Sequence, residues 1–570
     1  MRRKLRSILA GAAATLAVLA CTAPASPATA ADAPYDVLVF SKTAGFRHDS
    51  IAVGTQAIRD LGAANSFTVT ATEDAAAFTT GNLAQYEAVV FLNTTGDVLN
   101  NTQQAAFESY IGSGGGYVGV HSAADTEYGW TFYGNLVGAY FASHPAIQQA
   151  TVKVEDRAHA ATAHLPQTWT RTDEWYNYQT NARSTAHVLA TLDESSYSGG
   201  GMGTDHPHAW CKTYAGGRAF YTGGGHTQAS YAEPAFRAHL LGGIRYAAGR
   251  AKADCRPETG YTTLYNGSTT GWSQAGPGGF TNTDATLTSY DGMGLYWYSA
   301  KQFTNYSLKL DWRMAGDDNS GVFIGFPPSS DPWSAVNNGY EIQIDATDSP
   351  DRTTGSVYGF KSPDIAARDA ALNPPGEWNT FELLVEGERL RVYLNGAQVN
   401  DFTNPDPVRS LAGHIGLQNH GTGDDVSFRN IRIKELGGTP PPGPRTGPIV
   451  GLAGKCLDVR NAGTADGTQI QLYTCNGTAA QTWTVTPNST VKALGKCLDV
   501  SGGGSANGTK IQLWTCNGTG AQNWSAQADG SVRNPQSGKC LDVSGNNPAD
   551  STPVHLWTCH GGANQKWVMP

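Results

Sequence analysis

A six-residue motif that occurs three times near the carboxyl end constrains the fold of this chain more than any other feature. Gly-Lys-Cys-Leu-Asp-Val occupies residues 454–459, 495–500 and 538–543. In each copy a second cysteine follows the first by 19 positions, and a Gln-x-Trp sequence follows that cysteine. Three copies of about 40 residues each predict a β-trefoil with pseudo-threefold symmetry. A segment this short and polar buries little apolar surface, so one disulfide per repeat is the expected reinforcement.

The repeats resemble the ricin-B-type lectin module over residues 447–570. The resemblance implies that one aspartate per repeat accepts hydrogen bonds from sugar hydroxyls, while an aromatic ring lies under the sugar. The aspartates are Asp458, Asp499 and Asp542, and the rings are Tyr473, Trp514 and Trp557. We expect at least one of the three pockets to bind a pyranose weakly, with multivalency strengthening attachment.

The repeats differ in the residues that surround each aspartate. The resemblance also implies that an asparagine before the Gln-x-Trp glutamine binds the sugar. Only the third repeat keeps it, as Asn564, whereas the first two have alanine there. Asn476 and Asn517 are the candidates to compensate in those repeats. The third repeat has His555 where the others have glutamine. The glutamines and tryptophans of the Gln-x-Trp sequences are expected to be core residues.

The amino-terminal residues predict export. Basic residues at 2–6 precede an apolar stretch at 8–20, and Ala-Thr-Ala at 28–30 is a suitable cleavage site. Residues 1–31 are therefore expected to be a signal peptide of a secreted protein, with a lipid anchor at Cys21 as the alternative. Without Cys21, eight cysteines remain, an even number typical of disulfides formed outside the cytoplasm.

Length and charge limit the remaining possibilities. A chain of 570 residues predicts three to five domains. The net charge is −9, and four of the cations lie in the first six residues, so their removal leaves −13. This balance argues against nucleic acid and anionic lipid as partners. No later apolar run is long enough to span a membrane. The expected partner is a polysaccharide or oligosaccharide.

Residues 34–249 alternate between apolar strands and helical patterns, which predicts a parallel sheet with helices on both faces. In such folds, ligands bind beyond the carboxyl ends of the strands. The expected elements are strands at 36–40, 88–92 and 116–120 and helices at 51–61 and 102–111.

The residues that follow these strands resemble the ThuA-like (trehalose utilisation) family of the class I glutamine amidotransferase-like superfamily. The resemblance implies a flavodoxin-like α/β domain, and it rests on Phe-Arg-His at 46–48, Val-His-Ser at 120–122, Asp-Glu-Trp-Tyr at 173–176 and Gly-Gly-Gly-His-Thr at 223–227. Glutaminases of this superfamily carry a cysteine nucleophile where this chain has His121. Imidazole does not replace a thiolate in thioester formation, which argues against glutamine hydrolysis.

Four of these residues are candidates for a common site. His48, His121 and His226 together with Glu174 suit a divalent metal ion or a proton-transfer site, with His121 and Glu174 as catalytic candidates. The alternative is that the histidines only hydrogen-bond the loops at the edge of the sheet. Cys211 and Cys255 are expected to form a structural bridge at the end of the domain.

Residues 261–436 show only two-residue periodicity, which predicts a two-sheet sandwich of the concanavalin-like jelly-roll type. Asn395-Gly396 marks a hairpin. The Pro- and Gly-rich residues 437–446 are expected to be a linker. Motifs at 264–267, 319–323, 339–345 and 376–379 resemble the 3-keto-disaccharide hydrolase family.

That resemblance implies that a base removes the C2 proton of a sugar oxidised at C3, after which the glycosidic oxygen leaves and water adds. Glu341, Gln343 and Asp345 alternate along one strand and therefore share a face, with the isoleucines between them in the core. Glu341 is the expected base; Asn319, Gln343, Asp345 and His420 are expected to position the substrate. A structural role for Glu341 is the alternative.

Two further expectations concern the reaction. Many family members carry an arginine near residues 324–326, where this chain has Ile-Gly-Phe, so a substrate clamp is expected to be missing. The chain lacks a glycine-rich dinucleotide motif, so a separate oxidoreductase is expected to supply the keto-sugar. The leading hypothesis is a secreted carbohydrate-active enzyme; the alternative is a non-catalytic carbohydrate-binding protein of several domains.

Overall fold

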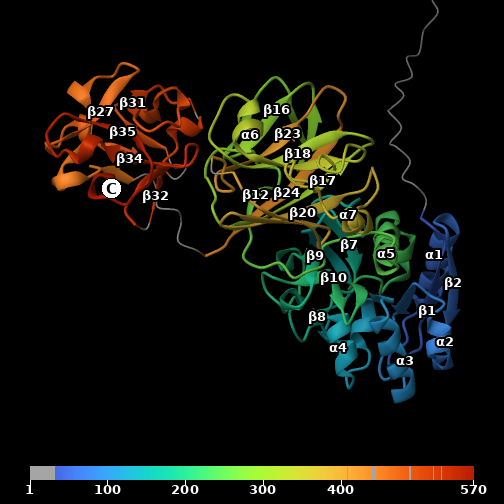
Figure 1. The fold of residues 1–570 in the computed structure, drawn as a ribbon. Helices are drawn as coiled ribbons and strands as arrows, with labels where there is room; N and C mark the ends of the chain where they lie inside the picture. Colours follow the sequence, from blue (N-terminus) through green and yellow to red (C-terminus); the bar gives the residue numbers. More distant parts are fainter. Residues whose placement is uncertain (1–31, 407, 438–444, 487–489, 518, 528) are drawn as a thin grey trace, which may run out of the picture.

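The structure is a computed structural model that describes residues 32–406, 408–437, 445–486, 490–517, 519–527 and 529–570. The expected signal peptide and most of the expected linker lie outside the described residues. Figure 1 shows three folded bodies in chain order, an α/β domain, a β-sandwich and a trefoil. The predicted fold classes and their order are confirmed.

The α/β domain is built on a nine-stranded sheet with the order β2-β1-β3-β4-β11-β10-β9-β6-β7. The first five strands in this order pair in parallel. They are β1 (Tyr35–Phe40), β2 (Phe67–Thr72), β3 (Ala88–Leu92), β4 (Gly116–Val120) and β11 (Gly217–Thr222). Their parallel alignment brings the carboxyl ends of β4 and β11 to the same edge of the sheet.

Helices cover both faces of this sheet, as expected. Alternate residues of β1 enter different cores: Val37 and Val39 pack with α1 and α5, whereas Leu38 and Phe40 pack with α2, α3 and α4. Both faces are thus apolar, which explains the uninterrupted apolar sequence of residues 37–40. The helices are α1 (Ile51–Ala64), α2 (Thr80–Leu83), α3 (Asn101–Gly112), α4 (Thr131–Val137) and α5 (Pro234–Ala247).

The sheet has more strands than the sequence predicted, because the prediction included only a parallel sheet. Four further strands extend it in antiparallel pairing. In the edge strand β7, buried and exposed residues alternate, so its pattern lacks the continuous apolar run of a central strand. The added strands are β6 (Gln148–Val154), β7 (Thr168–Asp173), β9 (His187–Leu192) and β10 (Pro207–Tyr214), and a separate pair is formed by β5 (Phe141–Ser143) and β8 (Asn177–Tyr178).

The middle domain is a sandwich of an eight-stranded and a five-stranded sheet around one apolar core. The larger sheet holds β12 (Thr262–Tyr265), β14 (Gly279–Thr283), β15 (Thr286–Tyr290), β17 (Tyr306–Met314), β20 (Asn379–Glu386), β21 (Arg389–Leu394), β22 (Ala397–Thr403) and β24 (Val426–Glu435). The smaller holds β13 (Trp272–Ala275), β16 (Gly294–Tyr298), β18 (Asn319–Phe326), β19 (Tyr340–Asp345) and β23 (His414–Asn419).

Local features of the sandwich agree with the sequence. Within the described residues of the sandwich, the α-helices are α6 (Trp333–Asn338) and α7 (Ile365–Ala371). Asn395 and Gly396 form the turn between β21 and β22, both with positive φ, as a two-residue hairpin of the expected type requires. The predicted Cys211–Cys255 bridge is present and ties β10 to the segment that leads into the sandwich.

The trefoil contains eleven strands and one disulfide per repeat, Cys456–Cys475, Cys497–Cys516 and Cys540–Cys559. Its core includes the tryptophans of the three Gln-x-Trp sequences, as expected. The strands are β25 (Arg445–Gly447), β26 (Cys456–Val459), β27 (Thr468–Tyr473), β28 (Trp483–Val485), β29 (Val491–Ala493), β30 (Lys496–Val500), β31 (Thr509–Trp514), β32 (Ser525–Ala526), β33 (Val532–Asn534), β34 (Lys539–Val543) and β35 (Thr552–Trp557).

Candidate functional sites

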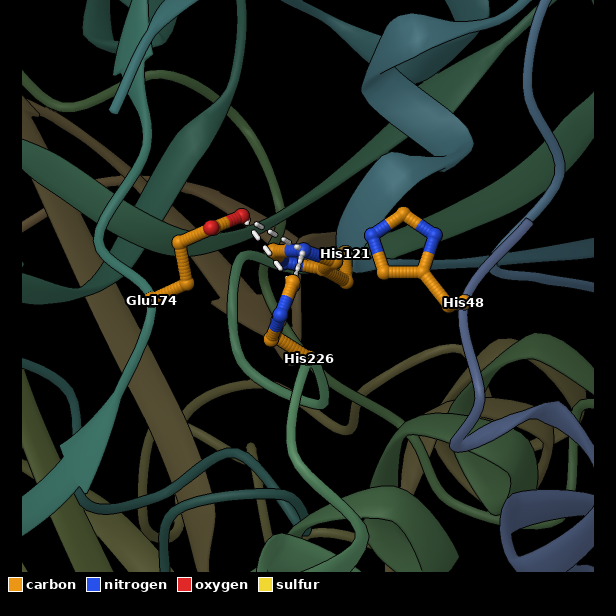
Figure 2. A group of neighbouring side chains, drawn as sticks. All are labelled: His48, His121, Glu174 and His226. Carbon is orange, nitrogen blue, oxygen red and sulfur yellow. Dashed lines mark hydrogen bonds and ion pairs between the residues drawn. The ribbon is translucent and has the colours of Figure 1, made fainter. Parts of the chain in front are cut away.

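Three histidines and a glutamate converge at the carboxyl edge of the parallel strands. His48 follows β1, His121 follows β4, His226 follows β11, and Glu174 directly follows β7. One possible ligand atom from each of the four side chains lies within 4.8 Å of the others. Figure 2 shows His121, His226 and Glu174 in direct contact, with His48 facing them. The structure therefore brings together the four residues singled out in the sequence.

The closest contacts involve one oxygen of Glu174. Its Oε2 lies 3.0 Å from His226 Nδ1 and 3.4 Å from His121 Nε2, and the two histidine nitrogens are 3.1 Å apart. Glu174 and His121 are buried, while His226 is partly exposed. The cluster is thus shielded by protein on one side and reaches solvent through His226.

Backbone and ring contacts fix the orientation of His121. Its Nδ1 lies 2.8 Å from the carbonyl oxygen of Gly223, so a proton on Nδ1 leaves the Nε2 lone pair directed at the cluster. Its φ of 49° is left-handed, a strained conformation for a residue with a Cβ atom. Tyr176 packs against the imidazole with ring centres 4.1 Å apart, which helps to hold it there.

The loop that carries His226 is held by a buried carboxylate. Asp173 pairs with Arg171 at 2.9 Å and accepts hydrogen bonds from the backbone N–H groups of Gly225 and His226. Gly225 has a φ of 108°, which favours glycine. Asp173 immediately precedes Glu174, and its carboxylate holds the loop that carries His226. The same short segment therefore positions two members of the cluster, Glu174 and His226.

Charges within the cluster shift the pKa values of its members. Burial, and then the neighbouring imidazoles of His121 and His226, lower the pKa of His48 to about 3. Burial opposes ionisation of Glu174, but hydrogen bonds with His121 and His226 hold its pKa below the usual value. His48 is therefore neutral and Glu174 ionised at neutral pH, the states in which these groups act as metal ligands.

The donor set and its spacing fit a divalent metal ion. Ligand atoms about 2.1 Å from a tetrahedral ion lie roughly 3.4 Å apart, close to the contacts among His121, His226 and Glu174. His48 contacts Ser122 Oγ through Nδ1 at 3.3 Å, which leaves its Nε2 for the cluster. Three imidazoles and one carboxylate suit zinc and related first-row ions.

Sequence reasoning missed His144, which contacts the second oxygen of Glu174 at 3.0 Å through Nδ1. His144 lies beyond the short strand β5, outside the parallel strands used to locate the site. Its proximity to Glu174 depends on the pairing of β5 with β8, which follows Glu174 closely in the chain. A single histidine in a loop gives no sequence signal for this contact.

A second group of polar residues lies on the outer face of the smaller sheet of the sandwich. Ile342 and Ile344 of β19 enter the core between the sheets, so Glu341, Gln343 and Asp345 face the other way, as predicted. Gly321 lies beside this row on β18, and a Cβ atom there would lie 2.4 Å from Glu341 Oε1. Glycine at this position therefore leaves room for the carboxyl group.

Glu341 is buried, and no cationic side chain contributes to the shift of its pKa. Burial raises this pKa to about 8, an effect that a hydrogen bond with Gln418 partly offsets. Gln343 is 1% exposed, and both polar atoms of its side chain lack a hydrogen-bond partner among the described residues. A carboxyl group with a pKa near neutrality and a free buried amide therefore lie on adjacent positions of one face.

The remaining expected residues of this domain lie at the end of the row. Asn319 donates a hydrogen bond to Asp345 at 2.9 Å, and Asp345 also accepts from backbone N–H groups of the following turn. His420 follows β23, is half exposed and contacts Asp424 at 2.9 Å. Through these contacts Asp345 stabilises the turn that follows β19. Sequence reasoning missed Gln418, which β23 places beside Gly321.

In the first two repeats of the trefoil, two glutamines hold the motif aspartate. Asp458 accepts hydrogen bonds from Gln471 at 2.8 Å and from Gln481 at 3.0 Å. The second repeat has the same arrangement around Asp499. The Gln-x-Trp glutamines are buried, as expected, and orient the aspartates. Asn476 and Asn517 accept hydrogen bonds from the backbone N–H groups of Thr478 and Thr519, and their contact with a sugar stays a prediction.

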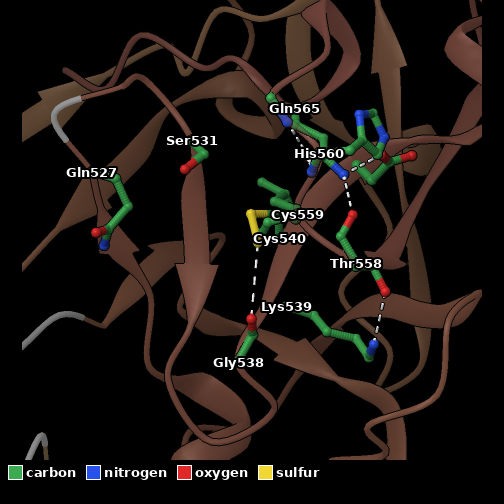
Figure 3. The surroundings of a disulfide bond; sticks show 12 residues. Gln527, Ser531, Gly538, Lys539, Cys540, Thr558, Cys559, His560 and Gln565 are labelled. Carbon is green, nitrogen blue, oxygen red and sulfur yellow. Dashed lines mark hydrogen bonds and ion pairs between the residues drawn. A yellow bond between two sulfur atoms is a disulfide. The ribbon is translucent and has the colours of Figure 1, made fainter.

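The third repeat surrounds its aspartate with more donors. Asn564 and Gln565 each donate to Asp542 Oδ2 at 2.8 Å, and His555 Nε2 lies 2.9 Å from Oδ1. Figure 3 shows the Cys540–Cys559 disulfide of this repeat with His560 and Gln565 close by. The rings of Trp514 and Trp557 are 37% and 38% exposed, as a stacking surface for a sugar requires, and Tyr473 is partly exposed.

Comparison with known families assigns each of the three bodies. The model described as trehalose utilisation matches residues 36–247, that of the 3-keto-alpha-glucoside-1,2-lyase-like domain matches 260–434, and that of the ricin-type beta-trefoil lectin domain matches 445–567. The three resemblances seen in the sequence are thus confirmed in their order along the chain.

Individual proteins match single domains. A 3-keto-disaccharide hydrolase of Bacteroides thetaiotaomicron is 25% identical over an alignment that covers 31% of this chain and 79% of the relative. A putative ThuA-like protein from Bacteroides uniformis is 23% identical and covers 39% of this chain and 94% of its own, with a TM-score of 0.35. The designed threefold-symmetric protein ThreeFoil is 30% identical and covers 21% and 95%, with a TM-score of 0.19.

A hydrolase-like domain related to sugar chemistry together with a lectin module fits a carbohydrate-active protein of several domains. The four disulfides and the lectin module are consistent with an extracellular location. Within the described part of the chain, every helix is too short or too polar to cross a membrane.

Proposed function

We propose that this protein is a secreted enzyme that cleaves 3-keto-glycosides in its middle domain and is held on polysaccharide by its trefoil. The observation that carries the proposal is the outer face of β19, where the buried Glu341 has a pKa raised to about 8 beside the free amide of Gln343. A general base works best when its pKa lies near the working pH. The family match of this domain supports the same chemistry.

The proposed reaction begins with removal of a proton from C2 of the keto-sugar by the Glu341 carboxylate. The electron pair of the C2–H bond moves to the C3 carbonyl and forms an enolate, whose oxygen accepts a hydrogen bond from the side-chain amide of Gln343. When the enolate collapses, the C1–O bond breaks, and the glycosidic oxygen leaves with its electron pair and takes up a proton. Water then adds across the C1–C2 double bond.

Activity of the full chain on a 3-keto-glucoside tests this function. We expect cleavage of the keto-sugar but not of the unoxidised glucoside, since only the ketone makes the C2 proton acidic. Glu341→Gln should lower kcat at least about a hundredfold, the usual contribution of a general base. Glu435→Gln, an exposed glutamate on β24, is the control and should retain activity.

Two outcomes would contradict this function. Equal activity of the wild type and Glu341→Gln would exclude Glu341 as the base. Absence of activity in both, with glycan binding retained, would favour the alternative of a carbohydrate-binding protein without catalysis. The proposal also requires another protein, an oxidoreductase, to form the ketone, since the chain has no dinucleotide motif.

The four-residue cluster of the α/β domain favours a second activity, metal-assisted acid–base chemistry on a sugar. His48, His121, His226 and Glu174 would hold a divalent ion, which when bound would polarise an oxygen of the substrate or of water. His144 would then orient Glu174 through its contact with Oε1.

A further inference from the structure

A cavity of about 400 Å³ lies between the α/β domain and the sandwich. It is lined by β9 and the residues after β6 on one side and by β12 and β24 on the other, elements that lie near one another in Figure 1. Its walls include Arg429 of β24, whose register partner is Asp311 of β17 in the larger sheet. The cavity is therefore distinct from the histidine cluster and from Glu341, which lies on the smaller sheet.

Four arginines line this cavity, and three of them are neutralised by carboxylates. The ion pairs are Arg157 with Asp284 at 2.6 Å, Arg183 with Glu155 at 2.8 Å, and Arg432 with Glu258 at 2.7 Å. Another acidic residue of the lining, Asp156, is paired with His187 at 2.7 Å. Arg183 also pairs with Asp205 at 2.7 Å, and Arg432 lies 3.5 Å from Asp311, so each of these three arginines has at least one carboxylate partner and the fourth arginine has none within ion-pair distance in the described residues.

That fourth arginine, Arg429, is 3% exposed, and its Nε and Nη2 lack a hydrogen-bond partner in the part of the chain that the structure describes. Among the described residues, no carboxylate forms an ion pair with it. The Cζ atom of its guanidinium lies over the ring of Trp378, 3.6 Å from the ring centre, so the aromatic face holds it in place. The side chain is therefore oriented before any ligand arrives.

The register partner of Arg429, Asp311, forms no ion pair with it and has its oxygens engaged elsewhere, including a contact with Arg432 at 3.5 Å. Asp311 accepts hydrogen bonds from Thr380 at 3.0 Å and from Asn430 at 3.2 Å. Burial disfavours an unpaired charge, and an incoming anion would remove this cost. The planar guanidinium matches the geometry of a carboxylate, which would approach it from the cavity that Arg429 lines.

The rest of the lining suits a ligand with hydroxyl groups. Gln167 and Asn266 meet across the domain boundary, where the Gln167 amide donates to the Asn266 carbonyl oxygen at 3.0 Å, and Thr263 lies in the same wall. The volume falls in the range of sites for small molecules. Charge, hydroxyl-compatible groups and size together indicate a small sugar that bears a carboxylate.

We propose that this interdomain cavity binds a uronic acid or a sugar of the same chemistry, with its carboxylate paired to Arg429. The site lies outside both proposed catalytic centres, and its existence does not depend on either proposed activity. Because residues from two domains line it, its occupancy would also hold the α/β domain and the sandwich together.

Calorimetric titration of the full chain with glucuronate, glucose and inorganic phosphate tests this proposal. We expect glucuronate to bind at least about tenfold more tightly than glucose or phosphate, as a charge-assisted pair predicts. Arg429→Met should lower glucuronate affinity at least about tenfold. Arg313→Met is the matched control, because Arg313 also stacks on Trp378, at 5.0 Å, but does not line the cavity; it should change affinity less than twofold.

Thermal unfolding keeps the test decisive if Arg429→Met folds poorly. Glucuronate should raise the Tm of the wild type, while the same concentration of glucose should not. Arg429→Lys, which keeps the charge and loses the planar fork, should reduce that shift. The proposal is overturned if glucuronate neither binds nor shifts Tm, if the Arg429 variants respond like the wild type, or if phosphate binds as tightly as glucuronate.

Discussion

The buried carboxyl group of Glu341 links catalysis to stability at the scale of one residue. Its folded-state pKa of about 8 lies above the ordinary 4.5, so between these values the native state keeps a proton that the unfolded state has lost. Native stability therefore falls as the pH rises through this interval, by at most about 1.4 kcal/mol per pH unit. Glu341→Gln should remove this slope, so that its stability relative to the wild type increases from pH 5 to about pH 8.

Denaturant unfolding of both proteins across this interval measures the effect. The activity should show the opposite trend, because the base acts in its ionised form: kcat/KM is expected to rise with pH and level off above about 8. Parallel stability curves for the two proteins would show that the Glu341 carboxyl group is ionised below neutrality.

The imidazole of His121 is the most buried ligand of the histidine cluster, and its removal should abolish metal binding. Purified protein, stripped with a chelator and then supplied with zinc, is expected to retain one ion per chain by atomic emission. His121→Ala should lower retention at least about tenfold. His164→Ala, an exposed histidine of the same domain, should retain the metal like the wild type. Failure of the wild type to retain any divalent ion would contradict the metal proposal.

At the scale of elements, each trefoil repeat offers a ring and an aspartate as one binding unit. Trp514→Ala removes the exposed ring of the second repeat and should weaken binding to an immobilised polysaccharide about two- to tenfold, as expected from the loss of one aromatic contact. Trp524→Ala is not a useful comparison, because that ring belongs to the core. Arg533→Ala, an exposed residue of β33, is the control; equal weakening by both changes would argue against stacking.

The elements also show what could be predicted from the sequence. The strands at 88–92 and 116–120 were predicted with their observed ends, because both faces of a central parallel strand are buried and its sequence is apolar throughout. The antiparallel half of the sheet was not predicted, since strands such as β7 bury alternate residues and give a weaker pattern. His121 directly follows a strand, His226 follows the glycine run, and His48 lies in the Phe-Arg-His motif of the loop after the first strand, so all three were found; His144 was not.

On the scale of the whole molecule, the Cys211–Cys255 bridge stabilises the junction of the first two domains. It joins residues 44 positions apart, and closing such a loop contributes roughly 4 kcal/mol in the chain-entropy model. Replacing both cysteines by alanine should therefore lower the Tm of the α/β domain in calorimetry, with the trefoil transition unchanged. An unchanged Tm would show that the interface holds the junction without the bridge.

The interface between these domains was outside the reach of sequence reasoning. Arg157 forms an ion pair with Asp284, and Arg245 forms one with Glu377. The partners of each pair are more than a hundred residues apart in the sequence, and no local pattern marks either pair. The same is true of Arg429, whose significance depends on the absence of a partner within a cavity formed by two domains. Periodicity identifies the faces of single elements, but charge matching between domains requires the assembled structure.

The most direct test of the proposed reaction is cleavage of a 3-keto-glucoside in D2O, with deuterium located in the keto-sugar product by NMR. Elimination removes the C2 proton and hydration returns one from solvent, so we predict deuterium at C2 of the product beyond that found in an incubation without enzyme. Cleavage with the original C2 hydrogen fully retained would indicate direct displacement at C1 and would contradict the proposed role of Glu341.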